Sequence, residues 1–171
     1  LRTIDGDFDY VSIGDVNKNG LIDAFDISVV ATELDGGVRA SNDKVAGSLE
    51  LTPNVKAYKA DEIVEIKVSG KDLNAVNALG FGLPYNTAEF EYVGVELVGM
   101  KDMVNLTYDR LHSNGQKALY PTFVNRGNNT LLDNGSNHLF TIKLKAKKAG
   151  KFNLKAIDGI LVDRNLGTIA F

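Results

Sequence analysis

The chain has 171 residues, a formal net charge of −3, 44% hydrophobic residues and 24% charged residues, so it can form a packed core in one medium domain or in a small module followed by a domain. The slight acidity gives no reason to expect a nucleic-acid or anionic-membrane partner. No apolar run is long enough to span a bilayer, and no cysteine is present for a disulfide framework.

The chain begins at Leu1 without a methionine or a signal sequence, so we expect a fragment of a longer protein. Close to this end, Asp5, Asp7 and Asp9 alternate with other residues. Three alternating aspartates could form a second, partial calcium site, but no glycine follows at the sixth position of this run. The simpler interpretation of these aspartates is a solvated turn.

Residues 15–26 read D-V-N-K-N-G-L-I-D-A-F-D, a pattern typical of a calcium-binding loop. Oxygen-bearing side chains stand at positions one, three, five, nine and twelve, and Gly20 stands at position six, where the backbone must turn sharply. Ca²⁺ needs about six to eight oxygen ligands aimed at one point, which explains this spacing. The predicted ligands are Asp15, Asn17, Asn19, the backbone carbonyl of Leu21, Asp23 and Asp26.

The competing interpretation is an Asn- and Asp-rich turn before a helix, because these residues also favour turns and helix N-caps. That interpretation accounts for Asp23 alone, but not for Asp15, Asn17 and Asn19 together with Gly20. We therefore expect Ca²⁺ as a cofactor. The last ligand is an aspartate where an ordinary EF-hand has glutamate, so the loop must close differently or bind more weakly.

The stretch that follows the loop predicts one helix over residues 24–34. Its apolar stripe comprises Ile27, Val30, Ala31 and Leu34. The helix should end at Asp35 and Gly36, since glycine readily adopts the left-handed cap conformation. A single helix cannot bury its stripe on itself, so it must lie against a neighbouring domain or a partner chain. The expected contact surface consists of Phe25, Ile27, Val30 and Leu34.

Residues 40–45 are expected to be a linker, and from residue 46 onward the pattern changes to short strands. Apolar and polar residues alternate clearly within 61–69, 137–147 and 151–156, which indicates strands with one buried and one wet face. Many short antiparallel strands of this kind pack as a two-sheet sandwich. Further strands are expected near 48–51, 55–59, 76–83, 89–98, 118–124, 129–132, 160–162 and 167–171, with a bulge at Gly94. Residues 101–117 and 125–136 are expected to be loops.

Residues 14–34, G-D-V-N-K-N-G-L-I-D-A-F-D-I-S-V-V-A-T-E-L, resemble a dockerin. The resemblance implies that residues 1–39 form a calcium loop-helix module and assigns the same calcium ligands. Dockerins normally carry two such repeats, and only one full repeat is visible. The pair that reads the partner, often hydroxylated in the family, is here Ala24 and Phe25. This departure suggests that Phe25 packs against an apolar surface.

Residues 46–171 resemble a cohesin, through the stretches 78–96, 139–154 and 158–169. The resemblance implies a mainly β fold, a jelly-roll sandwich of about nine strands. It also implies a dockerin- or cohesin-type partner, engaged in cis or in trans. Such modules occur together at the C-termini of secreted bacterial carbohydrate-active enzymes, which implies an extracellular, cell-surface or periplasmic location.

The expected function is therefore a non-catalytic, calcium-binding interaction, assembly and spacer module of an extracellular polysaccharide-degrading glycoside hydrolase. The alternative is a carbohydrate-binding sandwich. The chain lacks tryptophan, so a sugar platform would depend on Tyr85, Tyr92, Tyr108 and Tyr120.

Other side chains give weaker signals. His112 and His138 are expected to be surface or strand residues, and no nucleophile elbow, phosphate-binding glycine loop or zinc-helix motif is present. A basic run near the C-terminus is expected either to be a solvated strand face or to meet an acidic partner. This run consists of Lys143, Lys145, Lys147, Lys148 and Lys151.

Overall fold

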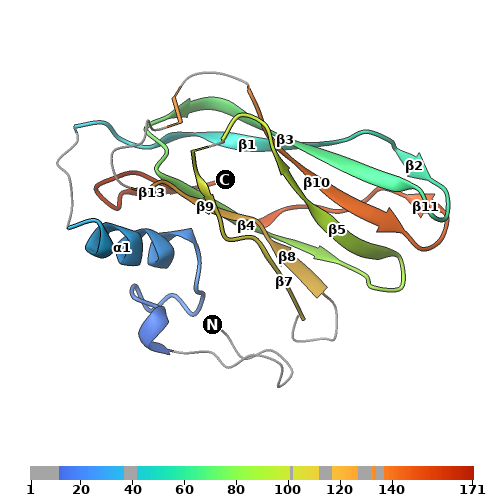
Figure 1. Cartoon of the computed structure of the whole chain (residues 1–171), viewed down its shortest axis with the longest axis horizontal. Helices are drawn as coiled ribbons and strands as arrows, with labels where there is room; N and C mark the ends of the chain where they lie inside the picture. Colours follow the sequence, from blue (N-terminus) through green and yellow to red (C-terminus); the bar gives the residue numbers. More distant parts are fainter. Residues whose placement is uncertain (1–11, 37–41, 101, 112–116, 127–131, 134–136) are drawn as a thin grey trace.

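The computed structural model describes residues 12–36, 42–100, 102–111, 117–126, 132–133 and 137–171. These ranges hold a short 3₁₀ turn, one α-helix and thirteen strands. The helix, α1, spans Ala24–Leu34, as the apolar pattern predicts, and the turn η1 spans Ser12–Gly14. The strands form two facing sheets, and α1 lies outside them (Figure 1). The aspartates of residues 5–9, His112 and most of the strand expected near 129–132 lie outside the described residues.

The first sheet has the order β1-β3-β10-β5, and every neighbouring pair is antiparallel. Its strands are β1 (Ala46–Pro53), β3 (Ile63–Asn74), β10 (His138–Ala146) and β5 (Phe90–Leu97). A two-stranded ribbon of β2 (Ala57–Tyr58) and β11 (Gly150–Lys151) lies apart from it. In β5 the register shifts between Tyr92 and Gly94, which confirms the bulge expected there.

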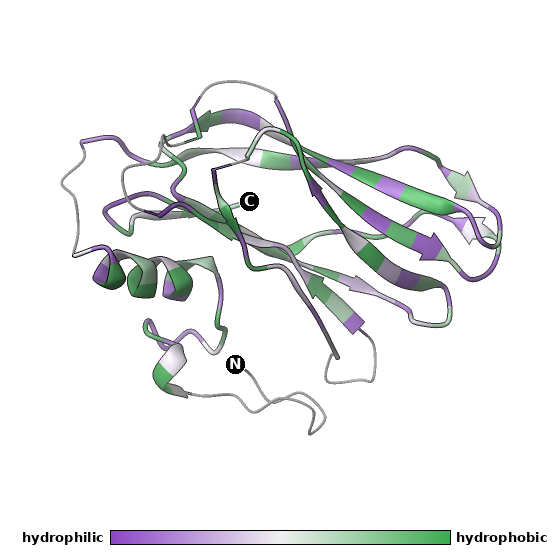
Figure 2. Ribbon diagram, in the orientation of Figure 1, coloured by the Kyte–Doolittle hydropathy of each residue, from purple (hydrophilic) through white to green (hydrophobic). Residues whose placement is uncertain are grey.

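Apolar and polar residues alternate along β3 and β10, so each strand has one face toward the core and one toward solvent, as the colouring of Figure 2 shows. Val64, Ile66 and Val68 of β3 are fully buried. On the opposite face, Lys143 Nζ lies 2.6 Å from Glu96 and 3.7 Å from Glu65.

Three lysines of the basic run near the C-terminus therefore form ion pairs with carboxylates. Besides Lys143, Lys145 pairs with Asp61 at 3.0 Å and Lys148 pairs with Glu89 at 3.2 Å. Since β10 lies inside the sheet, Lys143 and Lys145 belong to a solvated strand face and do not protect an edge.

The second sheet has the order β13-β12-β4-β8-β7, and β9 pairs with both β4 and β6. Its strands are β4 (Ala78–Tyr85), β6 (Val104–Asn105), β7 (Tyr108–Leu111), β8 (Lys117–Tyr120), β9 (Thr122–Val124), β12 (Ile157–Val162) and β13 (Thr168–Ala170). Pro121, which has no N–H to donate, separates β8 from β9 where the sequence suggested one strand over 118–124.

Two expectations about strands are wrong. Residues 104–105 and 108–111 form β6 and β7, although 101–117 reads as a polar loop. Conversely, of the alternating stretch 151–156 only Lys151 lies in a strand, and Phe152 adds a backbone hydrogen bond to the Lys56 carbonyl at 3.0 Å. The apolar side chains of that stretch, Phe152, Leu154 and Ala156, still pack against the core, which explains the alternation.

The core lies between the two sheets. Phe140 of β10 contacts Phe123 of β9 at a ring-centroid distance of 4.6 Å and Phe81 of β4 at 6.4 Å. β4 is buried on both faces: large residues point into this core, whereas its outward positions carry Ala78, Gly80 and Gly82. That outer face of small residues is where α1 lies.

Candidate functional site

The helix packs on the sandwich of its own chain. α1 contacts β12, β9 and β4. The buried residues of this contact are Ala24, Ala31, Ala78, Val124 and Val162, with Phe25, Ile27, Ile160 and Leu166 packed around them. Short side chains on both sides allow the helix to approach the sheet closely. The helix is thus seated in cis, a point that the sequence left open.

The expected contact surface of the helix is split by this packing. Phe25 and Ile27 are half-buried and pack against the apolar cluster between the helix and the sheet. Val30, in contrast, is 52% exposed and Leu34 is 70% exposed. The helix instead buries Ala24, Ser28 and Ala31, one turn apart on one face. At Ala24 this face comes close to β4, since a Cβ added to Gly80 would lie 3.3 Å from the Ala24 Cβ.

Polar contacts connect the two ends of the helical segment to the sandwich. At the C-terminal end, Arg126 donates to Asp35 through Nη2 at 2.8 Å and through Nε at 3.1 Å. At the N-terminal end, the Tyr108 hydroxyl lies 3.5 Å from the carbonyl oxygen of Ile22. The pairs link segments that are 91 and 86 residues apart in sequence.

The loop before the helix closes around two buried carboxylates. Asp15 is 2% exposed and accepts backbone N–H groups from Asn19 at 3.1 Å and Gly20 at 2.8 Å. Asp26 is 1% exposed and accepts from Val16 at 2.8 Å and Asp23 at 2.9 Å. Gly20 has φ of +86°, the left-handed conformation that the loop pattern assigns to glycine.

Asp23 links this loop to the helix. It is the N-cap residue, and its Oδ1 accepts the backbone N–H of Phe25 at 2.8 Å. With Asp26 at N3 it completes a capping box. Burial, and after it the nearby charge of Asp26, raises the pKa of Asp23 above its ordinary value, against the opposing effect of its hydrogen bonds. The loop therefore gathers negative charge at the start of the helix.

Asn17 and Asn19, the remaining predicted side-chain ligands, are exposed. Asn17 Oδ1 accepts from the Asn19 backbone at 3.1 Å, and Asn19 Oδ1 accepts from the Leu21 backbone at 2.8 Å. Asn19 also donates to Asp23 at 3.4 Å. The structure thus joins Asp15, Asn17, Asn19, Asp23 and Asp26 in one hydrogen-bonded loop.

The donor set consists only of hard oxygen atoms, which is the chemistry that Ca²⁺ takes. Within the described residues, no three His, Cys, Asp or Glu side chains are arranged to hold a metal ion as they stand. A carboxylate has about four acceptor positions, so Asp15 and Asp26 can keep their backbone hydrogen bonds and still face a cation. The residues fit Ca²⁺ provided that Asn and backbone carbonyl oxygens complete the set.

A small groove lies beside this loop. Its lining includes Asp23 and Ala24 at the start of α1, Gly80 and Gly82 of β4, Tyr108 of β7, Tyr120 of β8 and Asp158 of β12. The two tyrosine rings stack at 5.3 Å between centroids with 21° between their planes. Sequence reasoning missed this groove, because its lining comes from five separate segments of the chain. Its one local signal is the pair of glycines in an otherwise apolar strand.

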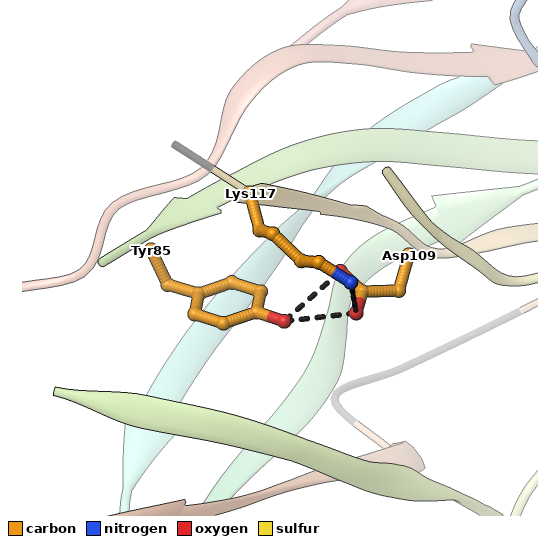
Figure 3. A network of polar contacts seen from close by, with 3 residues as sticks. All are labelled: Tyr85, Asp109 and Lys117. Carbon is orange, nitrogen blue, oxygen red and sulfur yellow. Dashed lines mark hydrogen bonds and ion pairs between the residues drawn. The ribbon is translucent and has the colours of Figure 1, made fainter. Parts of the chain in front are cut away.

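The other two tyrosines of the expected sugar platform belong to the interior. Tyr85 is 3% exposed, and its hydroxyl donates to the Asp109 carboxylate, whose oxygens lie 3.0 and 2.9 Å away (Figure 3). Lys117 Nζ lies 3.1 Å from the same carboxylate. Burial, and after it the hydrogen bond to Asp109, raises the pKa of Tyr85. Tyr92 is half-buried and packs against the core.

His138 lies on β10, as expected for a strand residue, and its Nε2 is 2.8 Å from the Thr141 hydroxyl oxygen. In the part of the chain that the structure describes, no helix is long and apolar enough to cross a membrane.

No protein-family model and no curated protein matches the chain. Solved structures do match it. A cohesin module from a family 33 glycoside hydrolase of Clostridium perfringens is 11% identical, with a TM-score of 0.56, covering 75% of this chain and 91% of that one. The sandwich has the cohesin fold.

Two further cohesin structures agree. A type II cohesin domain from the Acetivibrio cellulolyticus cellulosome is 12% identical, with a TM-score of 0.51, covering 74% of this chain and 89% of that one. A type I cohesin–dockerin complex from Clostridium thermocellum gives 16% identity and a TM-score of 0.51, covering 77% and 91%. Identities this low establish the fold, and the cohesin-like jelly-roll expected from the sequence is confirmed.

Proposed function

We propose that the chain is a non-catalytic protein-interaction module in which a calcium-ordered loop-helix is held against a cohesin-like sandwich as one unit. The observation that carries the proposal is the seating of α1 on the outer face of β4, with Ala24 fully buried there. The helix starts from a loop whose two buried carboxylates, Asp15 and Asp26, hold four backbone N–H groups.

The residues that would hold Ca²⁺ are Asp15, Asn17, Asn19, the Leu21 carbonyl, Asp23 and Asp26. When bound, the ion supplies positive charge among carboxylates that otherwise repel each other. The chain's own residues do the rest. Asp26 ties the loop entrance to the first helical turn, Asp23 caps that turn, and Ala24 places it over the glycines of β4.

The partner class follows from the fold. Solved cohesins similar to this chain are in complexes with dockerins, including complexes from Acetivibrio cellulolyticus and Clostridium thermocellum. We propose a dockerin-type protein module as the partner, and an extracellular setting within a carbohydrate-active enzyme such as the glycoside hydrolase that carries the Clostridium perfringens cohesin. Val30 and Leu34, exposed on α1, remain candidate contacts for that partner.

Two measurements on the full chain test this proposal. Calorimetric titration with CaCl₂ should give saturable heat for one site, and the melting temperature should rise with Ca²⁺ relative to excess EDTA. Titration with purified dockerin modules should then give binding in the presence of Ca²⁺. Absence of a calcium response overturns the loop assignment, and absence of binding across a broad dockerin panel overturns the partner class.

The second candidate function is carbohydrate binding. The observation in its favour is that Tyr108 and Tyr120 line a groove. Titration with soluble polysaccharides should give heat if the sandwich binds glycans, and no heat if its ligand is a protein.

A further inference from the structure

The groove between the loop of residues 15–26 and the second sheet is lined by acidic and aromatic side chains. Its residues include Asp23 and Asp158, and among the described residues that line it none is Lys, Arg or His. Phosphate, sulfate and carboxylate ligands are therefore disfavoured. The loop carries three carboxylates and Lys18, so one bound Ca²⁺ would make its formal charge zero, and Asp158 adds a carboxylate to the groove from outside the loop.

The groove also has an apolar aromatic wall. Tyr108 and Tyr120 are both half-buried and stacked on each other, opposite Ala24. Aromatic rings attract cations through the negative charge of their faces, and they also pack against the methylene stem of a long side chain. An aromatic wall next to a carboxylate suits a group that is apolar along its length and cationic at its end.

Backbone geometry builds the groove in two places. The register between β12 and β4 shifts between Ile157 and Ile160, and Asp158, in this irregular stretch, has φ of +51°. Bulges of this kind redirect a side chain, and a non-glycine residue with positive φ is strained backbone of the sort found at binding sites. Gly82 lets the Ile157 side chain lie close against β4 beside the groove, because a Cβ on Gly82 would lie 2.9 Å from that side chain.

We propose that this groove receives one basic side chain, a lysine or an arginine, from a protein partner. The stem lies between the tyrosine pair and Ala24, and the cationic end faces Asp158. This inference rests on the proposed function in one respect, that the ligand of the module is a protein. It defines a site separate from the exposed residues of α1.

The test uses the full chain with saturating Ca²⁺ and follows backbone amide signals by two-dimensional NMR. The probe is Nα-acetyl-lysine methylamide. Its Nε-acetylated analogue, which has the same stem without the charge, is the matched control ligand. We expect saturable shifts at Ala24, Gly80 and Gly82 with the charged probe, weaker binding at higher salt, and no saturable shifts with the neutral analogue.

Asp158→Asn should weaken binding of the charged probe about fivefold. Asp72→Asn is the matched control, because Asp72 is also exposed and also has φ of +51°, but lies away from the groove, and it should leave binding unchanged. Tyr120→Leu, which keeps bulk but removes the aromatic face, should also weaken binding.

Equal binding of the acetylated analogue, or an unchanged affinity in Asp158→Asn, overturns the proposal. Shifts at the same amides with methyl β-glucoside and none with the lysine probe would overturn it in favour of a neutral sugar site. The probe does not need a dockerin partner to bind, so failure of this titration and failure of the proposed function are separate results.

Discussion

Ala24, the first residue of α1, is fully buried, and a Cβ added to Gly80 of β4 would lie 3.3 Å from the Ala24 Cβ. The same added atom would also lie 3.3 Å from the Pro121 carbonyl oxygen and from the Thr122 hydroxyl oxygen. Helix and strand therefore meet with almost no side chain between them, and the closeness of this contact decides where the helix sits.

Gly80→Val should push α1 off the sheet. Its branched side chain must displace Ala24, the Pro121 carbonyl or the Thr122 side chain, and such overpacking costs about 1–3 kcal/mol of unfolding free energy. Amide hydrogen exchange in residues 27–34 should become faster. Gly94→Val is the control, since a Cβ there meets no atom within 4 Å, and slow exchange of the helix in Gly80→Val would contradict the described packing.

Asp15→Ala combined with Asp26→Ala should abolish the rise in melting temperature that Ca²⁺ produces. The double variant should also be less stable in EDTA, because each removed carboxylate leaves buried N–H groups unpaired at about 1–3 kcal/mol. Asp72→Asn, outside the loop, should respond to Ca²⁺ like the parent chain. A calcium response that survives in the double variant would refute the ligands.

Removal of the ion pair between Asp35 and Arg126 should have a small and local effect. Arg126 is exposed, so solvent screens the pair and its contribution to stability is small. A double-mutant cycle with Asp35→Asn and Arg126→Gln should give a small coupling energy that shrinks at high salt. Faster exchange should be confined to the last turn of α1. A coupling energy of several kcal/mol would mean that the pair, and not the apolar contact, holds the helix.

Tyr85→Phe should reduce the loss of stability at alkaline pH. The pKa of Tyr85 is raised in the folded chain, so the unfolded chain loses this proton first as the pH rises past about 10. The contribution of Tyr85 is thus complete below about pH 10 and declines above it. At neutral pH the variant should be destabilised by about 1–3 kcal/mol, since Asp109 loses a donor. Urea unfolding between about pH 8 and pH 11 measures both effects, and parallel curves would contradict the assignment.

Local signals were enough to predict some elements. The helix over residues 24–34 follows from the spacing of its apolar residues, and its end follows from Asp35 and Gly36. The central strands follow from alternation, because β3 and β10 each have one dry and one wet face.

Features that depend on distant partners could not be predicted. The apolar stripe of the helix suggested that Val30 and Leu34 would be buried, but the glycines of β4 select the alanine face instead. Apolar and polar residues alternate near 151–156 because every second side chain packs against the core, although the strand pairing of β11 ends at Lys151. The groove joins Asp23, Gly80 and Asp158, which no local window contains together.

The two-sided burial of β4 has a consequence for anyone dividing this chain. Sheets exposed to water normally carry polar residues on their outer side, but here Ala78, Val124 and Val162 occupy that side and are dry because α1 covers them. In a truncated protein that begins at residue 42, this apolar patch would be exposed to solvent, so the protein should tend to self-associate or precipitate. α1 therefore helps to keep the sandwich soluble, and the sandwich expressed without it should be less soluble than the full chain.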